Sequence, residues 1–219
     1  MFLAMTPDTE AAVEETKKLS VTSLGLPRQV RHVPLKDTKS LALDAAIKAK
    51  GLKIAVDAVN STGGIIMPML LEALGCEVVE VNCDPTGHFA HNPEPLPAHL
   101  EELSRIVVEE QCDLGISVDP DVDRLAFVCE DGSWFGEEYT LVAVADFILS
   151  KTPGNTVSNM SSTRALRIIT EKHGGTHTAS AVGEVNVVEA IRSSGAVIGG
   201  EGNGGVIYPT SHQIHFSQK

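Results

Sequence analysis

The sequence DLGISVDPDVDRLAFVC, residues 113–129, contains two short apolar runs separated by an acidic loop. The runs at 113–118 and 125–129 are rich in Val, Ile, Leu and Phe, which is typical of buried β-strands. The loop between them, residues 119–124, carries three aspartates at alternate positions and ends in an arginine. The segment therefore predicts a strand, a charged loop and a second strand.

An alternation of strands and helices continues on both sides of this segment. Before it, the pattern predicts helices at 41–50 and 98–111, strands at 53–58 and 76–81, and a polar turn at 60–64 that leads into a helix through residue 74. After it, the pattern predicts strands at 156–160 and 196–198 and helices at 163–173 and 183–193. This order is typical of an α/β fold, and we expect two consecutive units of mixed β-sheet covered by helices on both faces, the second one incomplete.

A polar Pro/Gly stretch at residues 150–155 interrupts the pattern, and the charge changes across it. Residues 72–146 hold 18 acidic and two basic side chains, whereas residues 151–219 hold four acidic and six basic ones. The sequence therefore predicts a domain boundary at this stretch. We expect a weakly structured N-terminal arm at 1–40, a first domain at 41–150 and a second domain at 151–219.

The 219 residues carry 17 basic and 29 acidic side chains, a formal net charge of −12. This charge argues against a nucleic-acid-binding protein, which needs a basic face, and against a polybasic membrane-surface protein. No stretch approaches the ~18 apolar residues of a membrane span, and the first residues lack the basic start of a signal peptide. We expect a cytoplasmic protein with no nucleic-acid partner and no membrane partner.

The chain has four cysteines and no Cys-x-x-Cys pair. In this pattern free buried thiols are favoured over disulfides or zinc ligands. The four residues concerned are Cys76, Cys83, Cys112 and Cys129.

The acidic loop has the composition of a site for a hard cation. Asp119, Asp121 and Asp123 can converge on one point if the loop curls, and without a cation they would repel one another. Several carboxylate oxygens suit Mg²⁺ or Ca²⁺ better than zinc. Arg124 follows directly and offers a fork of donors that matches phosphate, so the loop has the equipment of phosphoryl transfer. On spacing alone, an exposed acidic turn between two strands remains an alternative.

An EF-hand calcium loop is a second alternative for the same residues. Asp119, Asp121, Asp123 and Glu130 stand at the EF-hand positions for acidic ligands. Arg124, however, stands where that loop requires glycine, and the flanking runs predict strands rather than helices. We therefore reject the EF-hand.

A glycine-rich cluster at residues 199–205 is the second informative segment. Its glycines match the dinucleotide-binding pattern G-x-G-x-x-G, but the following residues, 206–209, cannot open a helix. A polar tip on a flexible loop is a better interpretation, because Glu201 and Asn203 can bind hydroxyl groups while glycines let the main chain approach a ligand. A plain glycine turn at a strand end is the alternative.

Other signals are weaker. The turn at 60–64 could cradle a phosphate at a helix start, but a tight connection is favoured. The histidine pairs at 88/91 and 212/215 lie in irregular segments, and glycines separate His173 from His177. We do not expect metal sites at these histidines.

Taken together, these motifs resemble the α-D-phosphohexomutases, the family of phosphoglucomutase, phosphomannomutase and phosphoglucosamine mutase. The metal loop of that family reads DGDxDR, and residues 119–124 read DPDVDR, with Pro120 in place of glycine. The sugar-binding loop of the family reads GExSGH, and residues 200–205 read GEGNGG, with Asn203 at the serine position and Gly205 in place of histidine. The resemblance runs from about residue 41 to residue 212.

The resemblance implies a role for each matching residue. Mg²⁺ would be held by Asp119, Asp121 and Asp123, the phosphate by Arg124, and sugar hydroxyls by Glu201 and Asn203. It further implies an isomerase, an intramolecular phosphotransferase that interconverts hexose 1-phosphate and hexose 6-phosphate in carbohydrate metabolism. The partner would be a hexose phosphate.

The same resemblance also marks what these 219 residues lack. The family transfers phosphate through a phosphoserine in a motif like TASHNP, and the HNP at 91–93 follows Phe-Ala rather than a serine. The chain then corresponds to the second domain and most of the third of a four-domain enzyme, without a catalytic serine. We expect a fragment inactive alone, which associates with a complementary chain or with itself. A non-catalytic module that binds a metal or a sugar phosphate, or half of a split enzyme, is the alternative.

Overall fold

The computed structural model describes residues 47, 48 and 50–209. The predicted N-terminal arm at 1–40 and the histidine pair at 212/215 lie outside the described residues. Of the helix predicted at 41–50, residues 47, 48 and 50 are described, and they are helical. The other elements can be compared with the structure directly.

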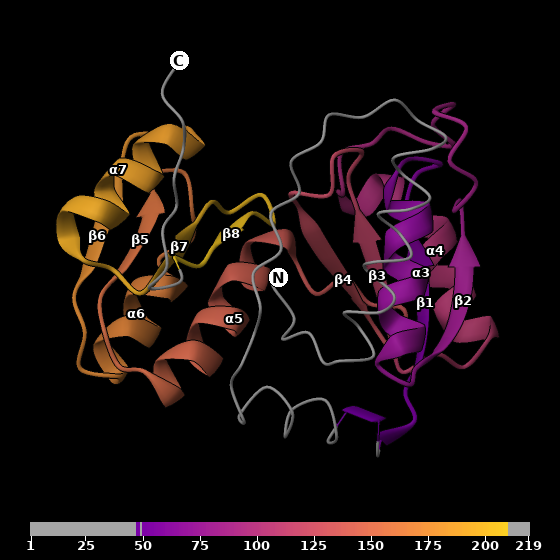
Figure 1. Cartoon of the computed structure of the whole chain (residues 1–219), viewed down its shortest axis with the longest axis horizontal. Helices are drawn as coiled ribbons and strands as arrows, with labels where there is room; N and C mark the ends of the chain where they lie inside the picture. The colour runs from indigo at the N-terminus through magenta and orange to yellow at the C-terminus, as the bar shows by residue number, and fades with distance from the viewer. Residues whose placement is uncertain (1–46, 49, 210–219) are drawn as a thin grey trace.

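The first unit is a four-stranded sheet with the order β2-β1-β3-β4 (Figure 1). Its strands are β1 (Lys53–Asp57), β2 (Glu77–Val81), β3 (Leu114–Val118) and β4 (Leu125–Cys129). Strand β1 pairs in parallel with both β2 and β3, and β4 is antiparallel to β3. The sheet is therefore mixed, as the sequence predicts.

Helices cover both faces of this sheet because side chains alternate along its strands. Ile54 and Val56 of β1 pack with Leu71 and the rest of the core beneath α3 (Gly63–Ala73). Ala55, between them, packs on the opposite face with residues of α4 (Glu101–Glu109). A short 3-10 helix, η1 (Pro97–His99), precedes α4.

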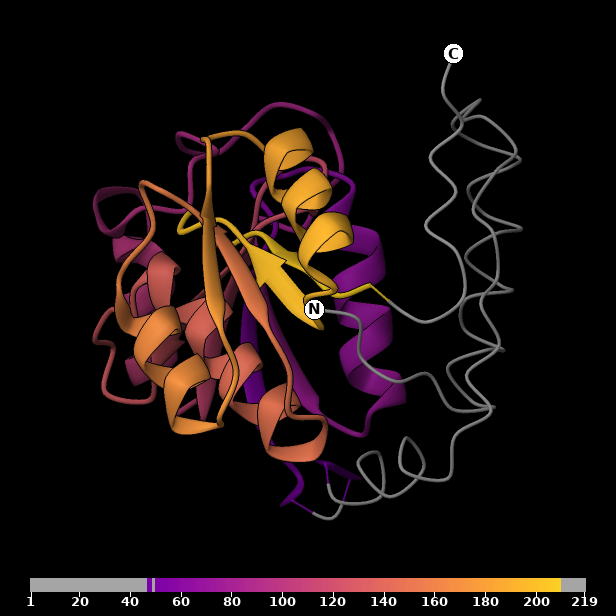
Figure 2. The same ribbon diagram turned by 90° about the vertical axis from the view of Figure 1, so that its left-hand side faces the viewer.

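The second unit repeats this architecture with the strand order β6-β5-β7-β8 (Figure 2). Its strands are β5 (Thr156–Asn159), β6 (His177–Ser180), β7 (Ile198–Gly200) and β8 (Val206–Ile207). Strand β5 is parallel to β6 and β7, and β8 is antiparallel to β7. On one face lie α5 (Glu137–Lys151) and α6 (Ala165–Lys172), and on the other lies α7 (Glu184–Ser194). The described part of this unit, which we expected to be incomplete, thus holds the same four-strand order as the first.

Helix α5 shares its core with the second sheet. Leu141 and Ala145 of α5 are buried with Leu166 of α6 and Ile198 of β7. The predicted boundary at 150–155 falls after α5, whereas these contacts place the helix with the residues that follow it. The polar stretch at 150–155 is the connection from α5 to β5.

The two sheets share a topological feature that places candidate sites. In each, the connection that leaves the first strand, β1 or β5, runs to one side of the sheet, and the connection that leaves the third strand, β3 or β7, runs to the other. In open α/β sheets, ligands bind at the carboxyl ends of strands whose connections diverge in this way. The residue directly after the third strand is Asp119 in the first unit and Glu201 in the second. Both residues predicted to bind ligands thus lie at the same position of equivalent sheets.

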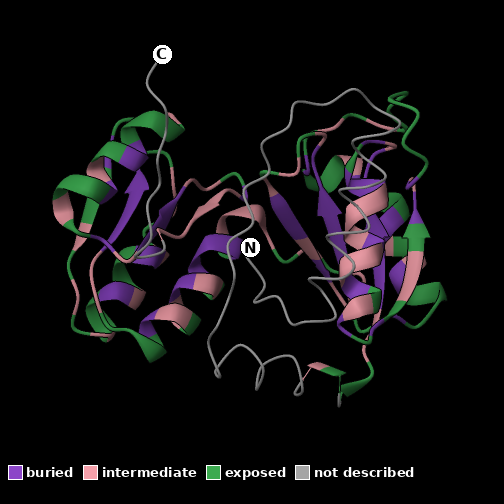
Figure 3. Cartoon of the chain, viewed as in Figure 1, coloured by how far each residue is buried: buried purple, intermediate pink, exposed green. Residues whose placement is uncertain are grey.

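The buried residues lie mainly on the strands and on the faces of the helices that are turned toward the sheets (Figure 3). Cys76, Cys83 and Cys112 are buried and Cys129 is partly buried, and all four thiols are free, which confirms the prediction. Within the described part of the chain, no helix is both long and apolar enough to cross a membrane.

Candidate functional site

The acidic loop curls at the carboxyl end of β3, against the start of α3. The Thr62 hydroxyl donates a hydrogen bond to the Pro120 carbonyl oxygen at 3.0 Å, and the Val122 amide donates to the Asp119 carbonyl oxygen at 3.1 Å. Val122 takes a left-handed φ of 62°, which is uncommon for a β-branched residue. A Cβ at Gly63 would lie 2.7 Å from Val118 Cγ2, so glycine allows α3 to approach this loop.

The curl brings the three predicted metal ligands together. One carboxylate oxygen from each of Asp119, Asp121 and Asp123 lies within 4.8 Å of the others. Asp119 is buried, with 2% of its surface exposed, while Asp121 and Asp123 are exposed. Among the described residues, these three aspartates are the one group of His, Cys, Asp or Glu side chains placed to hold a metal ion together.

The surroundings of Asp119 disfavour its negative charge. Burial raises its pKa to about 6, and the nearby charge of Asp123 adds to the increase. The Asp119 Oδ1 atom accepts hydrogen bonds from the amides of Asp123 and Arg124, at 3.1 and 3.0 Å, and the Arg124 amide partly opposes the rise in pKa. The three carboxylates offer only oxygen atoms, and the negative charge of Asp119 is disfavoured when no cation is bound. Such a group fits a hard divalent cation such as Mg²⁺.

Arg124 lies among carboxylates from two segments. Its Nε is 3.2 Å from Asp119 Oδ2 and 3.7 Å from Asp123 Oδ1, and its Nη1 is 2.6 Å from Glu94 Oε2. Glu94 belongs to the Pro-rich segment before η1 and was not predicted as a site residue. Nothing in its local pattern marks it, because the pair joins residues 30 positions apart.

The glycine cluster forms a tight hairpin between β7 and β8. The Glu201 amide donates to the Gly205 carbonyl oxygen at 3.1 Å, and the Gly205 amide donates to Asn203 Oδ1 at 3.0 Å. Glu201 Oε1 accepts hydrogen bonds from Asn159 Nδ2 at 2.5 Å and from the Gly183 amide at 3.0 Å. The Glu201 side chain is therefore fixed by donors from the ends of neighbouring strands.

A cavity of about 250 Å³ lies beside this hairpin. It is lined by residues that follow β5, β6 and β7: Asn159, Ser161, Val182, Gly183, Glu201, Gly202 and Asn203. Both predicted sugar-binding residues are thus brought to one cavity. The sequence did not identify three of the lining residues, Asn159, Ser161 and Gly183, as site residues. The one signal for them is their position near a predicted strand end or helix start.

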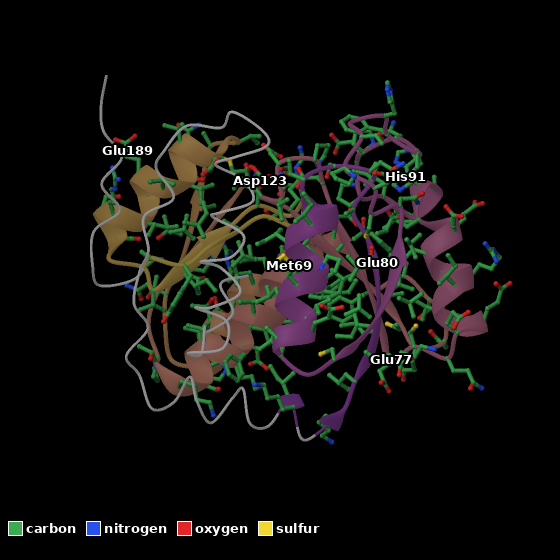
Figure 4. The ribbon with its side chains drawn as sticks, turned by 45° about the vertical axis from the view of Figure 1, so that its right-hand side comes forward. Met69, Glu77, Glu80, His91, Asp123 and Glu189 are labelled. Carbon is green, nitrogen blue, oxygen red and sulfur yellow. The ribbon has the colours of Figure 1, made fainter. Side chains whose placement is uncertain are left out.

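The acidic loop and the glycine hairpin are joined through their main chains. Arg124 and Gly205 form an antiparallel bridge, and the Leu125 amide donates to the Gly204 carbonyl oxygen at 3.2 Å. Thr140 of α5 donates its hydroxyl hydrogen to the Leu125 carbonyl oxygen at 2.8 Å. In Figure 4 Asp123 accordingly lies where the hairpin of the second unit meets the first unit.

The histidines discounted from the sequence make other contacts. His91 Nε2 lies 3.0 Å from the buried carboxylate of Asp57, and His173 Nε2 lies 2.7 Å from Asp146. His177 Nδ1 lies 3.0 Å from Thr156 Oγ1. None of these histidines belongs to the metal-ligating cluster found among the described residues.

Comparisons with known proteins agree with this geometry. Residues 35–132 match the family model described as phosphoglucomutase/phosphomannomutase, alpha/beta/alpha domain II, and residues 136–215 match that of domain III. A probable phosphoglucosamine mutase from Methanopyrus kandleri is 38% identical over 171 residues, which cover 77% of this chain and 38% of that protein. This chain therefore spans a little over a third of the length of that relative.

Solved structures give the same result. A phosphoglucomutase/phosphomannomutase family protein from Burkholderia thailandensis superposes with a TM-score of 0.68 at 30% identity, over 76% of this chain and 38% of that one. The N-acetylphosphoglucosamine mutase of Aspergillus fumigatus, determined in complex with GlcNAc-6P and magnesium, shares the fold at 18% identity, with a TM-score of 0.51 over 77% of this chain and 36% of that one. The chain thus belongs to the phosphoglucomutase/phosphomannomutase (α-D-phosphohexomutase) family, a family of isomerases, and matches its domains II and III.

Proposed function

We propose that this chain supplies the Mg²⁺ loop and part of the sugar site of a phosphohexomutase, which moves a phosphoryl group between positions 1 and 6 of a hexose. The observation that carries the proposal is the bridge between Arg124 and Gly205. It supports the proposal because Arg124, which would bind the phosphate, lies beside a loop that would bind hydroxyls, as a sugar phosphate requires.

Asp119, Asp121 and Asp123 would hold the cation, since their oxygens already lie within 4.8 Å of one another. When bound, Mg²⁺ would neutralise charge on the phosphoryl group during transfer. Arg124 would hold and orient the phosphate through its guanidinium, which is a fork of donors suited to oxyanions. A bound cation would also offset the mutual repulsion of the three aspartates.

The cavity beside the glycine hairpin would hold the sugar ring. Glu201 can accept hydrogen bonds from hydroxyl groups, and the amides of Asn159 and Asn203 can both donate and accept. The contacts of Glu201 Oε1 with Asn159 and Gly183 fix the carboxylate at the cavity wall before a ligand arrives. Such preorganisation lowers the entropic cost of binding.

We further propose that the 219 residues do not catalyse the reaction alone, because they contain no phosphoserine motif of the TASHNP type. A complementary chain would supply it, and in its absence self-association is expected. Conversion of glucose 1-phosphate to glucose 6-phosphate by the purified chain would overturn this part of the proposal. Binding of Mg²⁺ and a hexose phosphate without turnover would support it.

Calorimetric titration with Mg²⁺ tests the metal assignment. We expect binding to the unaltered chain and its loss in Asp121→Asn. Asp131→Asn is the matched control, because Asp131 lies beyond the opposite end of β4 from the acidic loop and its Oδ1 acceptor survives in asparagine. Equal heats for the unaltered chain and Asp121→Asn would overturn the assignment.

Titration with glucose 6-phosphate in the presence of Mg²⁺ tests the sugar site. Glu201→Gln removes a carboxylate from the cavity wall while keeping its shape, and we expect it to weaken binding about tenfold. Glu189→Gln, on α7 and outside the cavity lining, is the control for loss of one charge. Unchanged affinity in Glu201→Gln would contradict the assignment of this cavity to the sugar.

A further inference from the structure

The segment between β2 and η1 makes a histidine–carboxylate contact that the roles above do not explain. His91 of this segment reaches back to Asp57, the last residue of β1, with 3.0 Å between Nε2 and Oδ2. Asp57 is completely buried. Its Oδ1 accepts a hydrogen bond from the Val59 amide at 2.9 Å, and its Oδ2 also accepts one from Asn82 Nδ2 at 3.4 Å.

This contact anchors the segment to the first sheet. Removing a hydrogen-bond partner from a buried carboxylate is costly, because its charge is then less well compensated. Asp57 cannot turn to water, so His91 is held close to it. The other ring nitrogen, Nδ1, lies 2.8 Å from the Asn92 carbonyl oxygen, which fixes the ring against its own main chain. Figure 4 shows His91 at the same end of the first unit as Asp123.

Glu94 follows the anchor, and its main chain is held on both sides. Its amide donates to Asn92 Oδ1 at 3.0 Å, and its carbonyl oxygen lies 2.8 Å from His99 Nδ1. From this fixed backbone its carboxylate extends to Arg124, with 2.6 Å between Oε2 and Nη1. The position of Glu94 is therefore set by its own segment, independently of the acidic loop.

The Glu94 contact decides where the guanidinium of Arg124 can lie. The Nε of Arg124 faces Asp119 and Asp123, which are also the expected metal ligands. Without another carboxylate, Coulombic attraction would draw the whole guanidinium onto these oxygens, where a cation would have to displace it. With Nη1 on Glu94 and Nε facing Asp119, the guanidinium is held between carboxylates of two segments and is not drawn wholly onto the expected metal ligands.

We propose that Glu94 is a positioning residue for Arg124, held in place by the contact of His91 with Asp57. The proposal rests on the proposed function in one respect, the phosphate-binding role of Arg124. It adds that Glu94, in a segment outside both site loops, keeps the Arg124 guanidinium from moving onto the expected metal ligands.

The test observes the Arg124 guanidinium directly. In the ¹⁵N-labelled, metal-free chain, the Nε–Hε signal of Arg124 is assigned by its loss in Arg124→Lys, and the rate of rotation about Nε–Cζ is measured by NMR. We expect this rotation to be roughly two- to fivefold faster in Glu94→Gln. The expected increase is modest because the ion pair of Glu94 with Arg124 is about half exposed and therefore contributes little energy. His91→Gln should produce an increase in the same direction, and Glu94→Asp should restore part of the restriction.

Glu109→Gln is the matched control, because it removes the same charge from an ion pair with Arg105 on α4. It should release Arg105 and leave Arg124 unchanged. Thermal unfolding of each variant shows that the chain is folded, and Glu94→Gln alone decides the test if His91→Gln unfolds. An Arg124 signal in Glu94→Gln identical to that of the unaltered chain would overturn the proposal, as would an unchanged signal in folded His91→Gln. Because the measurement needs neither Mg²⁺ nor sugar phosphate, its failure is distinct from failure of the proposed function.

Discussion

The Leu125 amide donates a hydrogen bond to the carbonyl oxygen of Gly204, 3.2 Å away, and so ties the acidic loop of the first unit to the glycine hairpin of the second. Gly204 has a φ of +93°, and a Cβ on it would lie 2.7 Å from the Leu125 carbonyl oxygen. The close approach of the two loops therefore requires glycine at this position.

Gly204→Ala should destabilise the chain by roughly 2–4 kcal/mol, from backbone strain together with the clash. The control is Gly174→Ala, since Gly174 has a φ of +78° and nothing within 4 Å of its Cβ position. The control should lose only about 1–2 kcal/mol from backbone strain. Urea unfolding measures both, and equal losses would contradict the close approach.

Asp119 should make the metal-free chain less stable as pH rises. Its pKa in the folded chain is about 6 and its ordinary value is 3.8, so the folded state binds a proton more tightly than the unfolded state does. The contribution of Asp119 to the free energy of unfolding is fully present below its pKa in the unfolded state. It is lost as pH rises through its pKa in the folded state, between about pH 4 and pH 6. Asp119→Asn should remove this part of the pH dependence of stability, on the order of 3 kcal/mol, in urea unfolding followed across that range.

His177 should act in the opposite direction. Burial lowers its pKa below 6.5, and the positive charge of Arg167 lowers it further. Its contribution to stability is present above the unfolded pKa and is lost as pH falls through the lower, folded value. In His177→Gln, stability should therefore fall less on acidification below about pH 6.5 than in the unaltered chain. A steeper fall in the variant would contradict the assignment.

The four thiols should differ in reactivity. Burial raises the pKa of Cys83 to about 11 and also raises the pKa values of Cys76 and Cys112. Reaction requires an accessible thiolate, so these residues should be slow toward iodoacetamide in the native chain. Cys129 is partly buried and should be modified first. Mass spectrometry of partly modified, digested protein checks the order, and early modification of Cys83 would contradict it.

Much of the first unit could be predicted because its strands are short apolar runs with buried alternate faces. The acidic loop was recognisable because its three aspartates and its arginine lie within six consecutive residues. Helix α5 was missed because its apolar residues do not form one clear stripe: Leu141 and Ala145 are buried, whereas Tyr139 and Phe147 are about half exposed. Strand β6 reads HTAS and β8 has two residues, so neither shows the apolar pattern of a strand.

The residues missed at the site share one cause. Asn159 and Gly183 reach Glu201, and Glu94 reaches Arg124, across gaps of 42, 18 and 30 residues. Such contacts depend on the strand order of the sheets and on loops that cross the strand ends. They cannot be predicted from the local pattern of apolar and polar residues. The sequence identified the residues within each loop, while the structure identified what holds those loops.

The equivalent strand orders of the two sheets carry a consequence for how chemical roles are divided. The first strand of each unit ends in a buried polar residue, Asp57 or Asn159, and the third is followed by a carboxylate, Asp119 or Glu201. In one copy the carboxylate faces other carboxylates and suits a cation. In the other it faces amide donors and suits neutral hydroxyls. In the proposed function, a single backbone plan used twice would thus serve two unlike ligand groups, with the side chains around one carboxylate setting the difference.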